Sequence, residues 1–396
     1  MKFAFYSCMS GVNWGGSETL WSLAAMRLLD QGHQVGVNFK WWPQQSPQLT
    51  ELERKGAQLW LREKRNQGKF ASRLLDGWRI LRPSNGTNLD WLSRSRPDFL
   101  LITVGYHPDR VIIANQCHRL GIPYAINLQC ASSSVFINSQ RLQEFREAYQ
   151  NAARVFVVSE ENRQKLEANL ALKLNNVELV SNPFIVPWQT EASWPEEPEL
   201  KLACVGRIHF ASKGQDLLVQ ALSRPHWKDR AIKIGIVGKN QGNEEQLQDL
   251  IQLYGVEDKF VFEGFSNQIE DIWNRYHGLV LPSRYEGAAL VVTEAMLSHR
   301  MVVCTDTGRN RELVDDNRAG FLAKSPTADD VDEALNRAWQ SRENWQEMGL
   351  QAGRDIRSRY SPDPVGDFHG RLMELARSAP ALDGLETETA WLQPEN

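Results

Sequence analysis

Two carboxylates stand eight residues apart in SRYEGAALVVTEAM, the stretch from Ser283 to Met296. Glu294 falls among valine, alanine and methionine residues of a predicted helix, where a buried carboxylate is costly without a partner. Glu286 lies about two helical turns earlier, at the mouth of the same helix, so both carboxylates are expected to face one cleft. The alternative is that Glu294 only reaches the helix edge, where it caps or pairs with a neighbouring residue.

Two cations follow the first strand predicted in the second half of the chain. In CVGRIHFASKG, Arg207 stands just past the strand end and Lys213 stands near the next helix. Arginine binds phosphate in a fork and lysine binds it as a point charge, so the pair suits a diphosphate. Solvated surface cations are the alternative.

The helix after Glu286 offers a further contact for an anion. Its first free amides, near Ala289 and Leu290, are placed to take phosphate oxygens. Glu286 and Glu294 would then meet sugar hydroxyls on either side of that phosphate. Together with the two cations, this arrangement predicts a nucleotide-sugar site.

A glycine-rich loop, GVNWGGSE, follows the first predicted strand. Gly15 and Gly16 would let backbone amides approach an anion at a helix N-terminus. The glycine spacing is not G-x-G-x-x-G, and the second strand ends at Lys40, where a dinucleotide site has an acidic residue. A nicotinamide cofactor is therefore disfavoured, and a tight turn is the alternative for the loop.

The elements that carry these residues alternate between strand and helix patterns, first from residue 2 and again from residue 200. Such alternation predicts an α/β protein with two doubly wound, parallel sheets that are covered on both faces. Prolines between the two halves exclude a helix or a central strand there, so this stretch is a predicted linker. The expected divisions are a first domain at 1–186, a linker at 187–199, a second domain at 200–361, a final helix at 362–378 and an acidic tail at 379–396.

Composition sets the class of protein. The chain has 396 residues, of which 42% are hydrophobic and 24% charged, as in a globular protein with two cores. Its formal net charge of -4 gives no general attraction to nucleic acid. The five cysteines form no CxxC pattern, which is typical of buried thiols in a reducing compartment. Because no apolar segment reaches about 18 residues, no membrane span is expected, and we expect a cytoplasmic protein.

Several of these stretches together resemble one known family. They are GGSE near the N-terminus, VGR with Lys213, PSRYEGAALVVTEAM, TDTGRNREL and AGFL. The combination is similar to glycosyltransferase family four, the retaining enzymes related to sucrose synthase and bacterial mannosyltransferases. The resemblance covers residues 2–376, and its most specific part is the E-x7-E signature from Glu286 to Glu294. It implies the GT-B fold, in which two Rossmann-like domains face each other across a cleft.

The resemblance also implies roles for residues at the donor site. Gly16, with Gly15 beside it, would lie near the donor phosphates and sugar across the cleft. Arg207 and Lys213 would hold the diphosphate, and Glu286 would bind hydroxyls of the donor sugar.

Two further donor contacts follow from the same resemblance. Glu294 would take the ribose hydroxyls, and Ser266 with its neighbours after FEG would meet the base. Residues 363–376 would form the family's final helix, which crosses back onto the first domain.

This chain departs from the family's pattern on the acceptor side. Many members carry a histidine after the strand that follows GIP, where this chain has INLQCAS with Gln129. His107 in VGYHPD ends the preceding strand and is a spatial substitute, although an ordinary loop histidine is the alternative. The loop EGAAL also replaces the family's frequent EGFGL, so the fit of the donor is open.

The expected function is transfer of a sugar from a nucleoside diphosphate sugar to a saccharide or glycolipid hydroxyl, in polysaccharide or glycoconjugate synthesis. A UDP-sugar such as UDP-glucose is the first expectation for the donor and GDP-mannose the second. No covalent nucleophile is evident, so the resemblance implies retention by front-face attack. The alternatives are a nucleotide-sugar or saccharide binding protein without turnover, and a sugar-nucleotide epimerase of related fold.

Neither a cofactor nor a metal is expected beside the nucleotide sugar. The D-x-D from Asp330 to Asp332 stands at a helix start, where acidic residues suit the helix dipole. Basic residues around Trp60 and Trp78 are open to two interpretations. One is peripheral contact with an anionic membrane at the inner face or with a lipid-linked acceptor, and the other is a solvated helix face.

Overall fold

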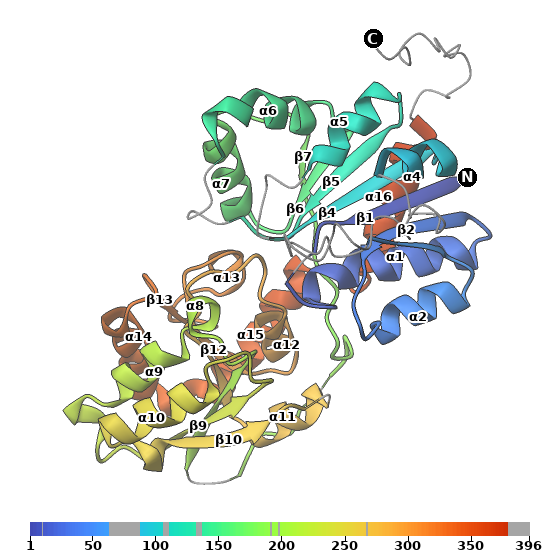
Figure 1. Ribbon diagram of the computed structural model, residues 1–396. Coiled ribbons are helices and arrows are strands. Elements are labelled where there is room, and N and C mark those ends of the chain that lie inside the picture. The colour runs from blue at the N-terminus through green and yellow to red at the C-terminus, as the bar shows by residue number, and fades with distance from the viewer. Residues whose placement is uncertain are drawn as a thin grey trace.

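The computed structural model describes residues 1–9, 11–62, 88–105, 111–131, 137–190, 192–196, 199–266 and 268–378. They form two parallel sheets in two separate halves of the molecule (Figure 1). This arrangement confirms the predicted α/β class. In the described ranges, no helix is both long and apolar enough to cross a lipid bilayer.

The N-terminal sheet has seven parallel strands in the order β3-β2-β1-β4-β5-β6-β7. Its central strands are buried along their whole length, as expected where helices cover both faces of a parallel sheet. The strands are β1 (Lys2–Ser7), β2 (Gln34–Lys40), β3 (Gln58–Arg62), β4 (Phe99–Val104), β5 (Tyr124–Leu128), β6 (Arg154–Val157) and β7 (Val177–Leu179).

Helices cover both faces of this sheet and build one apolar core on each. Ser46 and Ser159 cap α2 and α7 through their side chains, which fixes where these helices begin. Trp60 lies in β3 and packs against the core under α4 and α5, whereas Trp78 lies outside the described residues. The helices are α1 (Thr19–Asp30), α2 (Pro47–Arg54), α4 (Asn88–Ser95), α5 (Ile112–Arg119), α6 (Leu142–Gln150) and α7 (Glu160–Leu170).

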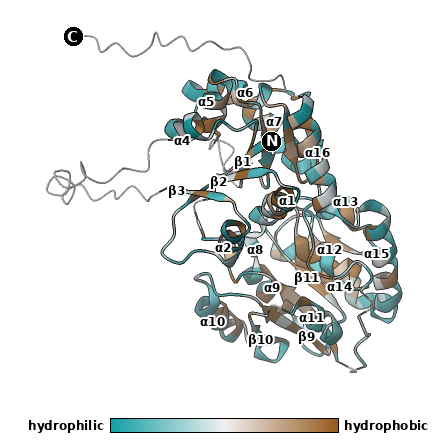
Figure 2. Ribbon diagram, turned by 90° about the vertical axis from the view of Figure 1, so that its right-hand side faces the viewer, coloured by the Kyte–Doolittle hydropathy of each residue, from teal (hydrophilic) through white to brown (hydrophobic). Residues whose placement is uncertain are grey.

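The C-terminal sheet has six parallel strands in the order β10-β9-β8-β11-β12-β13. The strands are β8 (Leu200–Val205), β9 (Ile232–Val237), β10 (Phe260–Gly264), β11 (Gly278–Leu281), β12 (Met301–Thr305) and β13 (Gly320–Ala323). Its helices are α8 (Phe210–Lys213), α9 (Gln215–Leu222), α10 (Glu244–Tyr254), α11 (Ile269–Arg275), α12 (Leu290–Leu297), α13 (Asn310–Leu313), α14 (Ala328–Gln340) and α15 (Trp345–Arg359). Figure 2 shows α12 and β11 as mainly hydrophobic, while α10 presents hydrophilic residues outward.

Each sheet begins in its middle, so the strand order reverses there. In the first sheet β1 lies between β2 and β4, and in the second β8 lies between β9 and β11. Ligands of open α/β sheets bind in the crevice outside the carboxyl ends of the strands at such a reversal. Residues that follow β1, β8 and β11 are therefore the ones to examine.

The last helix, α16 (Pro364–Ser378), belongs to the first half of the structure although it ends the described chain. It lies against α1, as the red ribbon beside the blue helix in Figure 1 shows. Phe368 packs its ring 5.1 Å from that of Phe156, and Arg27 forms an ion pair of 2.6 Å with Asp363. The residue limits predicted for the domains and linker stay predictions, and residues 379–396 lie outside the described part.

Candidate active site

Strand ends place two of the predicted site residues at the reversal of the C-terminal sheet. Arg207 follows β8, and Glu286 lies in the loop after β11. Lys213, at the end of α8, donates to Oε1 of Glu286 at 2.5 Å, and Oγ of Ser283 donates to the same oxygen at 2.7 Å. The Lys213 and Glu286 side chains are only 15% and 12% exposed. Sequence reasoning placed both residues at the site, but their direct pairing was not expected.

Two glycines allow Lys213 to reach this carboxylate. Gly214 has φ +66°, and a Cβ there would come within 2.0 Å of the carbonyl oxygen of Pro282. Helix α8 therefore ends directly against the loop after β11. The stem of Lys213 packs over Gly206, where an added Cβ would lie 3.3 Å from Cε of the lysine.

An arginine that the sequence analysis did not single out fixes the loop that carries Glu286. Arg284 makes two hydrogen bonds of 2.7 Å to the carboxylate of Asp216 on α9, and its Nη1 also donates to the carbonyl oxygen of Phe210. Its backbone amide donates to the carbonyl oxygen of Ser212 at 2.8 Å. Arg284 thus ties the loop after β11 to α8 and α9, the elements that hold Lys213.

Arg207 lies apart from this pair. Its Nη1 donates to Oε1 of Gln241 at 2.8 Å, and its carbonyl oxygen accepts from Gln215 at 2.8 Å. The side chain is exposed, so its charge faces solvent at the mouth of the site.

Glu294 is buried on α12, with only 4% of its surface exposed. Its Oε1 accepts a hydrogen bond of 3.3 Å from the backbone amide of Ile185, in the stretch that joins the two sheets. Burial raises the pKa of Glu294 to about 7, against the lowering effect of that one hydrogen bond. Without a ligand, the carboxyl group therefore keeps its proton to a higher pH than an ordinary glutamate does.

The glycine loop after β1 faces the start of α12. An added Cβ on Gly16 would lie 3.7 Å from Cδ1 of Leu290, whereas an added Cβ on Gly15 would lie 3.2 Å from Cε of Met9. Ala289 precedes the first residue of α12, and no described side chain caps this helix. Its first amides therefore keep the capacity to bind an anion.

A second close approach joins the two halves at Gly287. A Cβ there would come within 1.9 Å of the carbonyl oxygen of Gln129, just after β5. The side chain of Gln129 belongs to a chain of amides: it donates to Asn127 at 3.0 Å and accepts from Asn182 at 2.7 Å. The backbone of Gln129 thus meets the loop of Glu286, while its side chain forms hydrogen bonds within the first half.

Further contacts between the two halves surround Gly308 and were not foreseen. Glu161 on α7 accepts from the backbone amide of Gly308, and Glu312 on α13 accepts from the amide of Glu160 at 2.7 Å. Arg309 donates to Oγ of Ser181 at 2.9 Å. We call these five residues, Glu160, Glu161, Gly308, Arg309 and Glu312, the domain latch. The motif TDTGRNREL contains three of them, but nothing in it indicated partners some 150 residues away.

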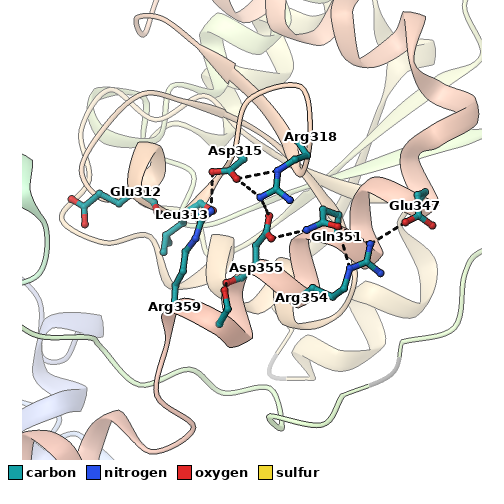
Figure 3. A network of polar contacts seen from close by, with 10 residues as sticks. Glu312, Leu313, Asp315, Arg318, Glu347, Gln351, Arg354, Asp355 and Arg359 are labelled. Carbon is teal, nitrogen blue, oxygen red and sulfur yellow. Dashed lines mark hydrogen bonds and ion pairs between the residues drawn. The ribbon is translucent and has the colours of Figure 1, made fainter.

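A network of polar contacts in the C-terminal half fixes the part of the domain latch that lies on α13 (Figure 3). Arg359 on α15 donates to the carbonyl oxygens of Glu312 and Leu313 and pairs with Asp315 at 2.9 Å. In Figure 3 the Glu312 carboxylate points away from this network. The network therefore holds the backbone of α13, while the carboxylate stays available for α7.

For the remaining predicted residues, the structure shows few contacts that bear on the site. Ser266 lies after β10, where its Oγ accepts from the amide of Gln268 at 3.1 Å. His107 lies outside the described residues. All five cysteines are described and none forms a disulfide. Across the described ranges, no group of three or more His, Cys, Asp or Glu side chains is arranged to hold a metal ion.

A family model matches the C-terminal half of the chain. Residues 188–354 match the family model described as glycosyl transferases group 1. The mannosyltransferase LpsB of Rhizobium meliloti, of lipopolysaccharide core biosynthesis, is 34% identical over 119 residues, which are 28% of this chain and 33% of that protein. The alpha-D-kanosaminyltransferase of Streptomyces kanamyceticus is 27% identical over 165 residues, 41% of this chain and 42% of that protein. The match thus spans less than half the length of each relative.

Solved structures extend the likeness to nearly the whole chain. Anabaena HepE in complex with UDP superposes with a TM-score of 0.72 at 17% identity, over 94% of this chain and 100% of that one. Sucrose-phosphate synthase of Thermosynechococcus elongatus gives a TM-score of 0.69 at 16% identity, over 96% of this chain and 100% of that one. At such identities the likeness shows the fold, which is GT-B.

Proposed function

We propose that this protein is a retaining glycosyltransferase that moves a sugar from a UDP-sugar to a saccharide or glycolipid hydroxyl. The observation that carries the proposal is the Lys213–Glu286 ion pair, placed at the sheet reversal and opposite the glycine loop. The group 1 match covers the half that holds this pair. Among proteins of the same fold, HepE was crystallised with UDP and with UDP-glucose, which favours UDP-glucose over GDP-mannose as the donor.

The ion pair provides for a change of partner when the donor binds. The diphosphate brings negative charge to Lys213, which then no longer depends on Glu286 for neutralisation. The carboxylate is released to accept hydrogen bonds from the donor sugar. Arg207 and the first amides of α12 complete the surroundings of the leaving diphosphate, and stabilising the charge that develops there lowers the barrier. These cations supply the positive charge that a metal supplies elsewhere, so we propose turnover without added metal.

Glu294 suits the ribose because it is buried and, among the described residues, has one weak hydrogen-bond partner, a backbone amide. Two ribose hydroxyls donate to a carboxylate better than the amide of Ile185 does, since they offer charge-assisted bonds on both oxygens. Donor binding would therefore draw Glu294 to its ionised form and lower its pKa.

Retention follows in this proposal from attack on the face that the diphosphate leaves. Both described contacts of Glu286 go to Oε1 and come from Lys213 and Ser283, which suits a hydrogen-bonding role better than that of a covalent nucleophile. The departing phosphate oxygen accepts the proton of the acceptor hydroxyl. The bond from the anomeric carbon to phosphate breaks as the bond to the acceptor oxygen forms.

The test is release of UDP from UDP-glucose, with GDP-mannose in parallel, each with and without saccharide acceptors. Acceptor-dependent UDP release and an α-linked product by NMR are the expected results. Saturable UDP binding without any release would favour a binding protein. Conversion of the donor to another nucleotide sugar would favour an epimerase.

A further inference from the structure

We propose that the acceptor carries a phosphate group, which Lys40 and Arg62 bind; the inference rests on the proposed function. Lys40 ends β2 and Arg62 ends β3, and the register of these parallel strands places the two residues side by side. They lie at the carboxyl edge of the N-terminal sheet, the same edge from which the loop of Gly16 reaches the donor half. The proposed function leaves this half to the acceptor.

Both cations are held in place by aromatic rings. Cζ of Arg62 lies 4.2 Å from the ring of Tyr6, and Nζ of Lys40 lies 4.2 Å from the ring of Trp42. Arg62 also donates to the carbonyl oxygen of Ser7, and no ion pair of Arg62 occurs in the described part of the chain. Ring and carbonyl contacts orient the guanidinium, and its charge also acts on the buried Glu18 carboxyl, whose pKa is raised by burial. Because Arg62 forms no ion pair with a described carboxylate, it keeps the capacity to bind an anionic ligand.

Two polar groups near this end of β2 have no hydrogen-bond partner among the residues that the structure describes. Asn38 is fully buried, and within the described ranges neither atom of its amide is hydrogen-bonded. It is two residues before Lys40 and so lies on the same face of the strand. The buried indole nitrogen of Trp42 likewise lacks a hydrogen-bond partner in the described part of the chain. Buried polar atoms are rarely left unsatisfied in proteins, and such exceptions call for an explanation, here a polar ligand.

Contacts run from these cations to the donor half. Ser7, which meets Arg62 through its carbonyl oxygen, bonds the Glu18 carboxylate through its hydroxyl. Glu18 closes the glycine loop, and Gly16 in that loop contacts Leu290 at the start of α12. An acceptor held by its phosphate at Arg62 is thus directed toward the site of Glu286.

Two adjacent cations fit a phosphate better than a neutral sugar or a single carboxylate. A phosphate monoester carries up to two negative charges and three acceptor oxygens, which match a guanidinium fork beside an ammonium. The phosphate belongs either to a soluble sugar or polyol phosphate or to a lipid headgroup. The same cations serve both, so the experiment has an arm for each source.

The binding experiment uses the full chain saturated with UDP, so that the donor site is closed to other anions. Calorimetric titration with glucose 6-phosphate, glycerol 3-phosphate and inositol phosphate is paired with glucose, glycerol and inositol. The lipid arm measures sedimentation with vesicles that contain phosphatidic acid, whose headgroup is a phosphate monoester, against vesicles of phosphatidylcholine. We expect at least about tenfold tighter binding of a phosphate-bearing member than of its neutral partner. Equal binding in every pair, or no binding of any phosphate compound, overturns the proposal.

Variants separate a ligand contact from a structural role. Arg62→Gln and Lys40→Gln should each weaken the phosphate-bearing ligand about 10-fold or more, in the range of one charge-assisted hydrogen bond. Arg62→Lys, which keeps the charge, should recover part of that loss. Arg54→Gln is the matched control, because this arginine of the same domain pairs with Glu51 on the surface of α2. Unchanged affinity in both Gln variants would refute the assignment even if the phosphate compounds bind.

The outcome is separable from that of the proposed function. If UDP does not bind, the proposed donor site fails, and the phosphate titrations are repeated on the UDP-free protein with the same variants. If UDP binds and is released from UDP-glucose while Arg62→Gln behaves like the parent, only the acceptor assignment fails.

Discussion

At the two carboxyl edges that face each other across this molecule, different kinds of contact hold the cations that line the proposed sites. On the C-terminal side, Lys213 is paired with Glu286 and Arg284 with Asp216, in contacts of 2.5 and 2.7 Å. On the N-terminal side, Arg62 and Lys40 lie over aromatic rings. A paired cation is held in position before any ligand arrives, but a ligand must replace its partner. Arg62, which has no ion pair in the described ranges, can attract an anionic ligand from solution.

The largest effect is expected when the cation of the donor edge, Lys213, is removed. Lys213→Gln takes away the charge that faces the diphosphate and leaves Glu286 without its partner. We expect kcat/KM to fall by about 1,000-fold or more, the scale of one lost transition-state contact with a further cost for the unpaired carboxylate. UDP release from UDP-glucose measures this.

Lys233→Gln is the control for that measurement, because Lys233 stands near the start of β9, at the opposite edge of the same sheet. If Lys213→Gln and Lys233→Gln show the same activity, the ion pair is structural and the donor site is elsewhere.

Glu286→Gln tests the other member of the pair. Glutamine keeps the shape but removes the charge that faces a sugar becoming positive, so kcat should fall by about 10- to 1,000-fold. UDP affinity should not weaken, since Lys213 then meets the diphosphate without competition. Turnover equal to that of the parent would contradict the catalytic role, and weaker UDP binding would contradict the change of partner.

Glu294→Gln should act on binding rather than on chemistry. The ribose does not change during the reaction, so UDP and UDP-glucose should both bind about 10- to 100-fold more weakly, as for one or two charged hydrogen bonds. Calorimetry with UDP, UDP-glucose and glucose distinguishes this from a general defect. Tight UDP binding by the variant would remove Glu294 from the site.

The same residue predicts a pH dependence of stability. The pKa of Glu294 is raised to about 7 in the folded protein, so the unfolded state, with its lower pKa, releases this proton first. This contribution is present in full at low pH and is lost as the pH rises through 7. Between pH 6 and pH 8 the free energy of unfolding should fall by about 1 kcal/mol more in the parent than in Glu294→Gln. Denaturant unfolding at both pH values measures it, and parallel curves would show that Glu294 titrates normally.

The smallest effect is expected at the domain latch. Glu312→Gln weakens the contact with the amide of Glu160 and should raise the KM for the donor only a few-fold, because one partly buried hydrogen bond is worth about 1 kcal/mol. Solution scattering should show that UDP compacts the parent more than the variant. Glu347→Gln, in the network of Figure 3 but within one domain, is the control. Identical profiles for Glu312→Gln and the parent would exclude a role of the latch in closure.

The sequence could predict elements and strand ends, but not pairs that depend on backbone turns. Alternating strand and helix patterns suffice for two parallel sheets, and a residue that follows a strand must lie at the carboxyl edge. On that basis, the sequence predicted that Arg207, Lys213 and Glu286 lie at one edge of the sheet. It did not show that Lys213 meets Glu286, since this requires the positive φ of Gly214 and the close approach of Pro282.

Contacts between the two halves could not be predicted from the sequence, for another reason. Glu161 and Gly308 are 147 residues apart, and neither has a pattern of hydrophobic residues that would specify its partner. Such pairs are set by how two finished sheets meet, which periodicity along one chain does not encode.

The return of α16 to the first sheet has a consequence for how the protein is made. Val365, Phe368 and Leu372 fill a core whose other members include Phe3, Leu20 and Leu28. A ribosome therefore delivers the first residues of that core long before the last. The C-terminal sheet has all its strands and can close its cores while the N-terminal half still exposes an apolar face. Residues near position 370 thus complete the half of the molecule that was synthesised first, and a chain stalled before them would offer that face to chaperones.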